Sequence, residues 1–166
     1  MNCLLLSGSV RKGSITVKFL DIVANHFSNI TFGRFSLDRL PLFHPDAYDE
    51  QISNEVHAFK KEIGKADIVL IATPEYIHNI PAVLKSALEW TTKTGELKNK
   101  KVIPIVFTPY APRGEKAMVS LLQSLKALES KVTTSVLIHH DILNSNRGLT
   151  NDGIELFENI WELYFE

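Results

Sequence analysis

The sequence contains a single cysteine, Cys3, in 166 residues. One cysteine excludes an intramolecular disulfide framework and is consistent with a reducing compartment. Charge of one sign is not in excess either, because 18 basic and 19 acidic residues leave a formal net charge of -1. Proteins that bind nucleic acid or an anionic membrane surface electrostatically carry a positive excess, so neither class is favoured.

Long apolar runs are missing as well. No stretch approaches the roughly 20 apolar residues of a membrane-spanning helix, and the N-terminus lacks the charged and then apolar layout of a signal peptide. Apolar residues nevertheless make up 45% of the chain, which is enough for a full core at this length. We therefore expect one domain over residues 1–166, located in the cytoplasm.

Apolar runs of strand length alternate with helical patterns along the whole chain. The runs lie at residues 3–7, 30–37, 67–73, 101–108 and 132–138. Between and after them, apolar residues recur at the spacing of one helix face. Five such alternations predict a parallel sheet with helices on both of its faces.

The composition of each run predicts its place in the sheet. Central strands are buried on both faces and read as continuous apolar runs, whereas edge strands keep polar positions. The first, third and fourth runs are nearly all apolar, and the second and fifth are mixed. This pattern predicts a flavodoxin-like three-layer sandwich with a five-stranded parallel sheet of order 2-1-3-4-5. Pro104 opposes a central fourth strand, unless a bulge or the register places its missing N–H at the strand end.

The chain is organised around the loop that follows the first run, within LLLSGSVRKGSIT at residues 4–16. A Gly- and Ser-rich turn into a helix directs backbone N–H groups at one point, where an anion binds. Ser14 replaces the lysine of a Walker loop, and Val10 replaces the second glycine of a dinucleotide loop. Cys3 lies too far upstream to be a phosphatase nucleophile. The remaining candidates are a monophosphate site and an ordinary strand-to-helix turn. The residues of such a site would be Ser9, Arg11, Ser14 and Thr16.

A second motif, ATPEYIHNIPAVLKSALEW at residues 72–90, follows the third run. Pro74 fixes one backbone dihedral, and Pro81 suits the first turn of the next helix. The residues between them would form a ledge for a planar ligand, with the rings of Tyr76 and His78 and several backbone amides beside it. The alternative is an ordinary turn in which Asn79 caps the helix.

Together, GSVRKGS and PEYIHNIPAVLKSALEW resemble the NAD(P)H-dependent FMN reductase family, which includes quinone, azo-dye and chromate reductases. The resemblance implies FMN as cofactor, NADPH or NADH as co-substrate, a small-molecule electron acceptor and a homodimer or homotetramer. It implies no catalytic side chain and no metal, since the cofactor carries the chemistry. The cofactor-binding residues that we expect in the two motifs are Ser9, Arg11, Ser14, Ile15, Thr16, Pro74, Glu75, Tyr76, Ile77, His78 and Asn79.

The chain also departs from the family pattern. Thr16, Ile77 and His78 stand where the family commonly has Asn, Asn and Gly, so the substrate class and the hydride-donor preference stay open. Lys85 matches the usual lysine of the following helix. The third loop, TPYAPRGEK, departs furthest. We expect Tyr110 to border the flavin, while Arg113 either borders it, meets a phosphate or is solvated.

The predicted function is hydride transfer from NAD(P)H through FMN to a quinone, free flavin or similar acceptor, by a ping-pong mechanism. The alternatives are an electron carrier of the flavodoxin type and a non-catalytic FMN-binding module. Near neutrality and Arg11 disfavour a carrier, because flavodoxins tend to be strongly acidic. His139, His140 and Asp141 are neighbours after the last run, but adjacent strand residues point to opposite faces, so we expect no shared metal ion.

Overall fold

Five parallel strands form one sheet with the order β2-β1-β3-β4-β5 in the computed structural model, which describes residues 1–48, 52–146 and 148–165. This order confirms the flavodoxin-like topology that was predicted from strand composition. The strands are β1 (Asn2–Ser7), β2 (Thr31–Phe35), β3 (Ile68–Thr73), β4 (Lys101–Thr108) and β5 (Val136–His139).

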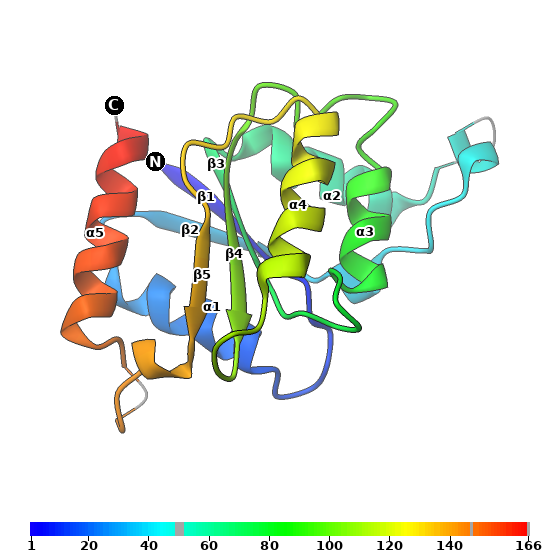
Figure 1. The fold of residues 1–166 in the computed structure, drawn as a ribbon. Helices are drawn as coiled ribbons and strands as arrows, with labels where there is room; N and C mark the ends of the chain where they lie inside the picture. The colour runs from blue at the N-terminus through cyan, green and yellow to red at the C-terminus, as the bar shows by residue number, and fades with distance from the viewer. Residues whose placement is uncertain (49–51, 147, 166) are drawn as a thin grey trace.

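Helices cover both faces of the sheet, as Figure 1 shows. The long helices are α1 (Ile15–His26), α2 (Asn54–Lys65), α3 (Ala82–Glu89), α4 (Glu115–Ala127) and α5 (Asn151–Phe165). Three short 3₁₀ helices are η1 (Leu37–Arg39), η2 (Pro45–Tyr48) and η3 (His140–Ile142). In the part of the chain that the structure describes, no helix has both the length and the apolar character to cross a membrane.

Two hydrophobic cores make the three layers. On one face of the sheet, α1 and α5 pack through buried residues that include Phe19 and Phe157. On the other face, α2, α3 and α4 pack through residues that include Phe59, Leu84 and Leu121. Alternate side chains of each central strand enter opposite cores, which is why these strands read as continuous apolar runs.

Burial along the strands agrees with their predicted positions. Every residue of β3 is buried, and β4 is buried from Val102 to Thr108, whereas β2 buries only Phe35. The second strand is shorter than the predicted 30–37, because the chain turns into η1 directly after it. The predicted strand extended to residue 37 because Leu37 is apolar. Leu37 is buried in the core, but pairing of β2 with β1 ends at Phe35.

Pro104 lies inside β4, where the register resolves the conflict that its missing N–H poses. The N–H of Val102 donates to Lys131 O on the β5 side at 2.9 Å, and N–H groups two residues apart in a strand face the same neighbour. The nitrogen of Pro104 therefore also faces the β5 side. Pairing with β5 begins only at Ile105 and Val136, so no β5 residue is paired opposite the proline.

The predicted fifth strand, 132–138, is wrong at its N-terminal end. The Tyr164 hydroxyl from α5 lies in the gap between β4 and the segment before β5. It accepts a hydrogen bond from Thr133 N–H at 3.1 Å and donates one to Val102 O at 3.0 Å. A side chain thus replaces the ladder there, and β5 begins at Val136.

Candidate functional site

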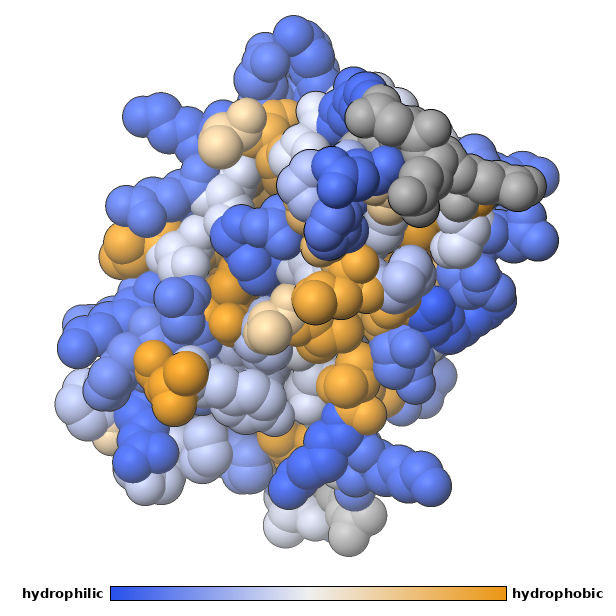
Figure 2. All heavy atoms as spheres, turned by 90° about the vertical axis from the view of Figure 1, so that its right-hand side faces the viewer, coloured by the Kyte–Doolittle hydropathy of each residue, from blue (hydrophilic) through white to orange (hydrophobic). Residues whose placement is uncertain are grey.

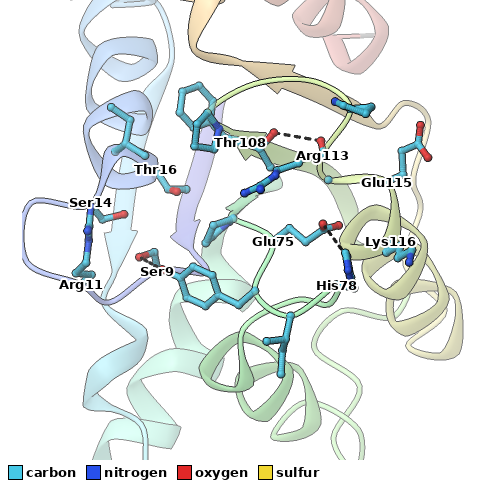
Figure 3. Close-up of a pocket in the computed structure, with 18 residues that line it drawn as sticks. Ser9, Arg11, Ser14, Thr16, Glu75, His78, Thr108, Arg113, Glu115 and Lys116 are labelled. Carbon is cyan, nitrogen blue, oxygen red and sulfur yellow. Dashed lines mark hydrogen bonds and ion pairs between the residues drawn. The ribbon is translucent and has the colours of Figure 1, made fainter.

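A cavity of about 550 Å³ opens at the carboxyl ends of β1, β3 and β4. In this strand order, the edge between β1 and β3 is the topological switch point, where ligands of open α/β sheets bind. Figure 3 shows side chains from the three loops turned toward this space. All the predicted cofactor-binding residues line the cavity except Asn79 and Tyr110. Those that do are Ser9, Arg11, Ser14, Ile15, Thr16, Pro74, Glu75, Tyr76, Ile77 and His78.

The first loop is fixed to the sheet by short hydrogen bonds. Gly8 N–H donates to Ala72 O of β3 at 2.8 Å, and the Ser7 hydroxyl donates to Ser9 O at 2.9 Å. Gly8 has no room for a side chain, because an added Cβ would lie 2.3 Å from Thr73 Oγ1. The loop therefore lies tightly against β3 and directs its hydroxyls toward the cavity.

Helix α1 begins at the cavity, and no capping side chain accepts from the backbone N–H groups of its first turn. Ser14 is the N-cap residue, but its side chain makes no capping hydrogen bond, and the first turn contains no acidic residue. Thr16 is buried, and its Oγ1 has no hydrogen-bond partner among the described residues. Arg11 lines the same end of the cavity and makes no ion pair within the described ranges. A buried hydroxyl without a partner is costly, so the residues at this end of the cavity could hold a ligand with acceptor oxygens.

The loop after β3 forms a tight two-residue turn. Tyr76 N–H donates to Asn79 O and Asn79 N–H donates to Tyr76 O, both at 2.9 Å. Between them, Ile77 and His78 have positive φ values of 45° and 60°. Asn79 does not cap the next helix; its Oδ1 accepts from Ile80 N–H at 2.8 Å, and Pro81 is the N-cap residue of α3.

The first and second motifs meet inside the cavity. Ser9 Oγ and the Tyr76 hydroxyl lie 3.3 Å apart, although 67 residues separate them in the sequence. The end of the cavity formed by Ser9, Arg11, Ser14 and Thr16, here called the anion end, is therefore adjacent to the ledge of residues 74–79, and both face the same space. Lys85, in contrast, is an exposed residue of α3 that pairs with Glu89 at 2.7 Å and does not line the cavity.

Glu75 connects the ledge to the opposite wall of the cavity. Its Oε2 accepts from Ala117 N–H of α4 at 3.0 Å, and its Oε1 lies 3.5 Å from His78 Nδ1. Burial raises the pKa of Glu75. Hydrogen bonds from Ala117 N–H, the His78 ring and Gly114 N–H lower it by more than burial raises it, so the pKa of Glu75 lies below its usual value. The carboxylate thus serves as the cap that the N-terminus of α4 otherwise lacks.

The third loop makes the remaining wall. Thr108 Oγ1 donates to Arg113 O at 3.1 Å and is hydrogen-bonded to His139 Nδ1 at 2.8 Å. The Arg113 guanidinium lies over the Tyr110 ring, 4.9 Å from its centroid. Arg113 lines the cavity, whereas Tyr110 supports it from outside.

Some lining residues were not predicted as binding residues, among them Phe107, Glu115 and Lys116. Phe107 lies in β4 directly before the loop TPYAPRGEK, and Glu115 and Lys116 are the last two residues of that loop, where the sequence singled out only Tyr110 and Arg113. His140 stacks on Phe107 with ring centroids 5.4 Å apart, so its ring and that of His139 have different partners. Within the described ranges, no group of three or more His, Cys, Asp or Glu side chains could hold a metal ion.

The sheet order and the cavity define a flavodoxin-like protein with a ligand site at the switch point of its sheet. The family model described as NADPH-dependent FMN reductase matches residues 1–141. The chain therefore belongs to the NADPH-dependent FMN reductase family.

Several known proteins are similar to the chain. It is 37% identical over 131 residues to the NADH:(hydroxy)cinnamate reductase subunit CrdA of Vibrio ruber, a match that covers 78% of the chain and 64% of that relative. It is 30% identical over 136 residues to a quinone reductase of Escherichia coli K12, covering 76% of the chain and 70% of the relative. The match to a 2-hydroxy-1,4-benzoquinone reductase of Burkholderia sp. covers only 47% of that protein.

A solved structure shows the same fold over nearly the whole chain. The flavoenzyme NAD(P)H:(acceptor) oxidoreductase FerB from Paracoccus denitrificans superposes with a TM-score of 0.83 at 20% identity, over 98% of this chain and 94% of that one. A flavodoxin from the domain Archaea superposes less closely, with a TM-score of 0.57.

Proposed function

We propose that the chain is a single-domain, FMN-dependent oxidoreductase that takes reducing equivalents from NADPH or NADH and passes them to a small acceptor such as a quinone or free flavin. The observation that carries the proposal is one cavity with an anion end beside a ledge, at the switch point of the sheet. Membership of the FMN reductase family supports the same cofactor. The activities of similar proteins, which include quinone reductases, support the acceptor class.

The residues at the anion end suit the FMN phosphate. Ser9 in the loop after β1, and Ser14 and Thr16 at the start of α1, are buried hydroxyl residues, and Arg11 adds a fixed positive charge beside them. Phosphate oxygens would accept from the Thr16 hydroxyl, which has no hydrogen-bond partner in the part of the chain that the structure describes. A charge-assisted hydrogen bond contributes about 1.5–3 kcal/mol, so these groups together would favour FMN over an uncharged flavin.

The other lining residues suit the ring system. Tyr76 would lie beside it, Pro74 and the 75–79 backbone would form its ledge, and Arg113 would border it from the third loop. When bound, FMN would accept hydride from the nicotinamide and pass it to the acceptor in a ping-pong cycle. The chain's own groups orient the ligand and, at the loop after β3, offer backbone N–H donors.

Purified protein mixed with FMN, NADH or NADPH and benzoquinone tests this function directly. We expect nicotinamide oxidation that requires both FMN and the quinone. Arg11→Ala should lower the apparent FMN affinity by about one to two decades, which corresponds to the loss of one charge-assisted contact. Absence of quinone-dependent oxidation with either nucleotide, at saturating FMN, would reject the enzyme assignment.

We propose that the protein forms a homodimer or homotetramer, as the resemblance implies. We also propose a cytoplasmic location, with which the single cysteine is consistent. The exposed apolar side chains of Leu42, Ile77 and Val119 are suited to subunit contact, and Figure 2 shows apolar side chains among hydrophilic ones on the face that bears α3. Sedimentation equilibrium should give a mass of two or four chains, and a monomer at micromolar concentration would contradict this proposal.

A further inference from the structure

The turn at Ile77 and His78 has a backbone conformation that its residue types disfavour. Two-residue turns with positive φ at both central positions favour Asn-Gly, because those residues adopt this backbone at low cost. A β-branched residue at φ 45° followed by histidine at φ 60° is unusual in such a turn. Strain of this kind concentrates at functional sites. Both side chains line the cavity.

The His78 ring has a defined orientation through one nitrogen. Its Nδ1 lies 3.5 Å from Glu75 Oε1, and the other oxygen of Glu75 is held by Ala117 N–H at 3.0 Å. Because a carboxylate accepts hydrogen bonds, the proton of neutral His78 belongs on Nδ1, which leaves Nε2 for another partner. The His78 side chain is 72% exposed, so its ring can exchange protons with water.

Other ionisable groups around the cavity are less suited to deliver a proton. Arginine and lysine hold their protons too tightly at neutral pH, tyrosine does so as well, and carboxylates are already ionised there. Histidine is the side chain that gains and loses a proton in this range. The other ionisable side chains that face the same cavity are Arg11, Tyr76, Arg113, Glu115 and Lys116.

We propose that His78, oriented by Glu75, donates a proton to the electron acceptor, and that the physiological acceptor is a quinone-like carbonyl compound whose product must be protonated. The proposal rests on the function proposed above. Reduction of a quinone to a hydroquinone takes two electrons and two protons. The transferred hydride carries both electrons and one proton to the quinone, and His78 Nε2–H gives the second proton to the oxygen that becomes anionic. His78 is left neutral with its proton on Nδ1 toward Glu75, and it regains a proton from water.

The test compares the rates at which the wild type and one variant reduce two different electron acceptors. Ferricyanide takes up electrons without a proton, whereas benzoquinone needs one. His78→Gly removes the imidazole and also relieves the positive φ, so the variant should fold at least as well as the wild type. We expect the ratio of the single-turnover rate with benzoquinone to that with ferricyanide to fall about 100-fold. The matched control is His57→Gln, on the exposed side of α2, which should keep the wild-type ratio.

Two further readouts separate this role from a structural one. The benzoquinone rate of the wild type should fall as the pH rises, because the proposed step consumes a proton held by an imidazole, and His78→Gly should lack this fall. In ¹⁵N-labelled protein without flavin, NMR of the imidazole nitrogens should show the Nδ1–H form at His78, and Glu75→Gln should weaken that preference.

Each outcome is decisive. An unchanged rate ratio in His78→Gly overturns the proposal and leaves the reductase function standing, and so does an Nε2–H form of His78 in the wild type. A wild type that reduces neither acceptor overturns the proposed function and this proposal with it.

Discussion

Replacing Glu75 should weaken the junction between the two walls of the cavity. The carboxylate accepts from the backbone N–H of Ala117 at 3.0 Å and is also bonded by Gly114 N–H, so it caps α4 from a distant loop. Glutamine keeps an acceptor oxygen but loses the charge, and charge-assisted hydrogen bonds are roughly twice as strong as neutral ones. We therefore expect Glu75→Gln to lower the free energy of unfolding by about 1–2 kcal/mol at pH 7.

The pH dependence of this effect has a defined sign. The pKa of Glu75 is lowered in the folded protein, so its ionised form is favoured by folding. The resulting stability is fully present above the ordinary glutamate pKa, about 4.3, and is lost as the pH falls through the lower folded value. The difference between the wild type and Glu75→Gln should therefore shrink as the pH is lowered below about 4.

Urea unfolding at pH 7 and at about pH 3, followed by tryptophan fluorescence, measures both effects. Glu62→Gln is the matched control, because Glu62 forms an exposed pair with Lys65 and such pairs contribute about 0–1 kcal/mol. A Glu75→Gln protein as stable as the control variant at pH 7, or a difference that grows in acid, would refute the capping role.

Three further predictions concern the framework of the site. Gly8→Ala should destabilise the fold by about 1–3 kcal/mol through the clash with Thr73, whereas Gly64→Ala, which meets no atom within 4 Å, should stabilise it by about 0.5–1 kcal/mol; thermal unfolding of both variants checks this contrast. Tyr164→Phe should cost about 1–3 kcal/mol in urea unfolding, because three backbone groups lose a partner, and an unchanged midpoint would contradict the role of its hydroxyl. Burial raises the pKa of Cys3 to about 12, so a thiol reagent at neutral pH should label it only after unfolding, and rapid labelling of the native protein would show that β1 opens.

The strand order could be predicted from the sequence because burial on two faces leaves a mark in each strand. The residues of β3 are apolar up to its last residue, Thr73, and all of them are buried. Pro104 appeared to conflict with the fold because the fifth strand was predicted to begin at residue 132, early enough to pair with β4 opposite the proline. In the structure this pairing begins only at Ile105 and Val136. The N-terminal limit of β5 depends on Tyr164, which lies 31 residues after Thr133 in the chain, so local sequence patterns could not place it.

The location of the cavity was predictable from the sequence, but the contacts inside it were not. Ser9 and Tyr76 belong to motifs that the topology brings together, and the structure places them 3.3 Å apart. The capping role of Glu75 depends on α4, 42 residues further along the chain, and no local pattern signals such a contact. The turn at Ile77 was not predictable either, because its residue types disfavour the backbone that they adopt.

The central claim is that the loop between β1 and α1 binds the phosphate of FMN. Fluorescence titration of the protein with FMN and with riboflavin, which lacks the phosphate, tests it most directly. We predict that FMN binds at least about tenfold more tightly than riboflavin, and that Thr16→Val and Arg11→Ala each narrow this difference without weakening riboflavin binding. Equal affinities of the wild type for the two flavins would contradict the account.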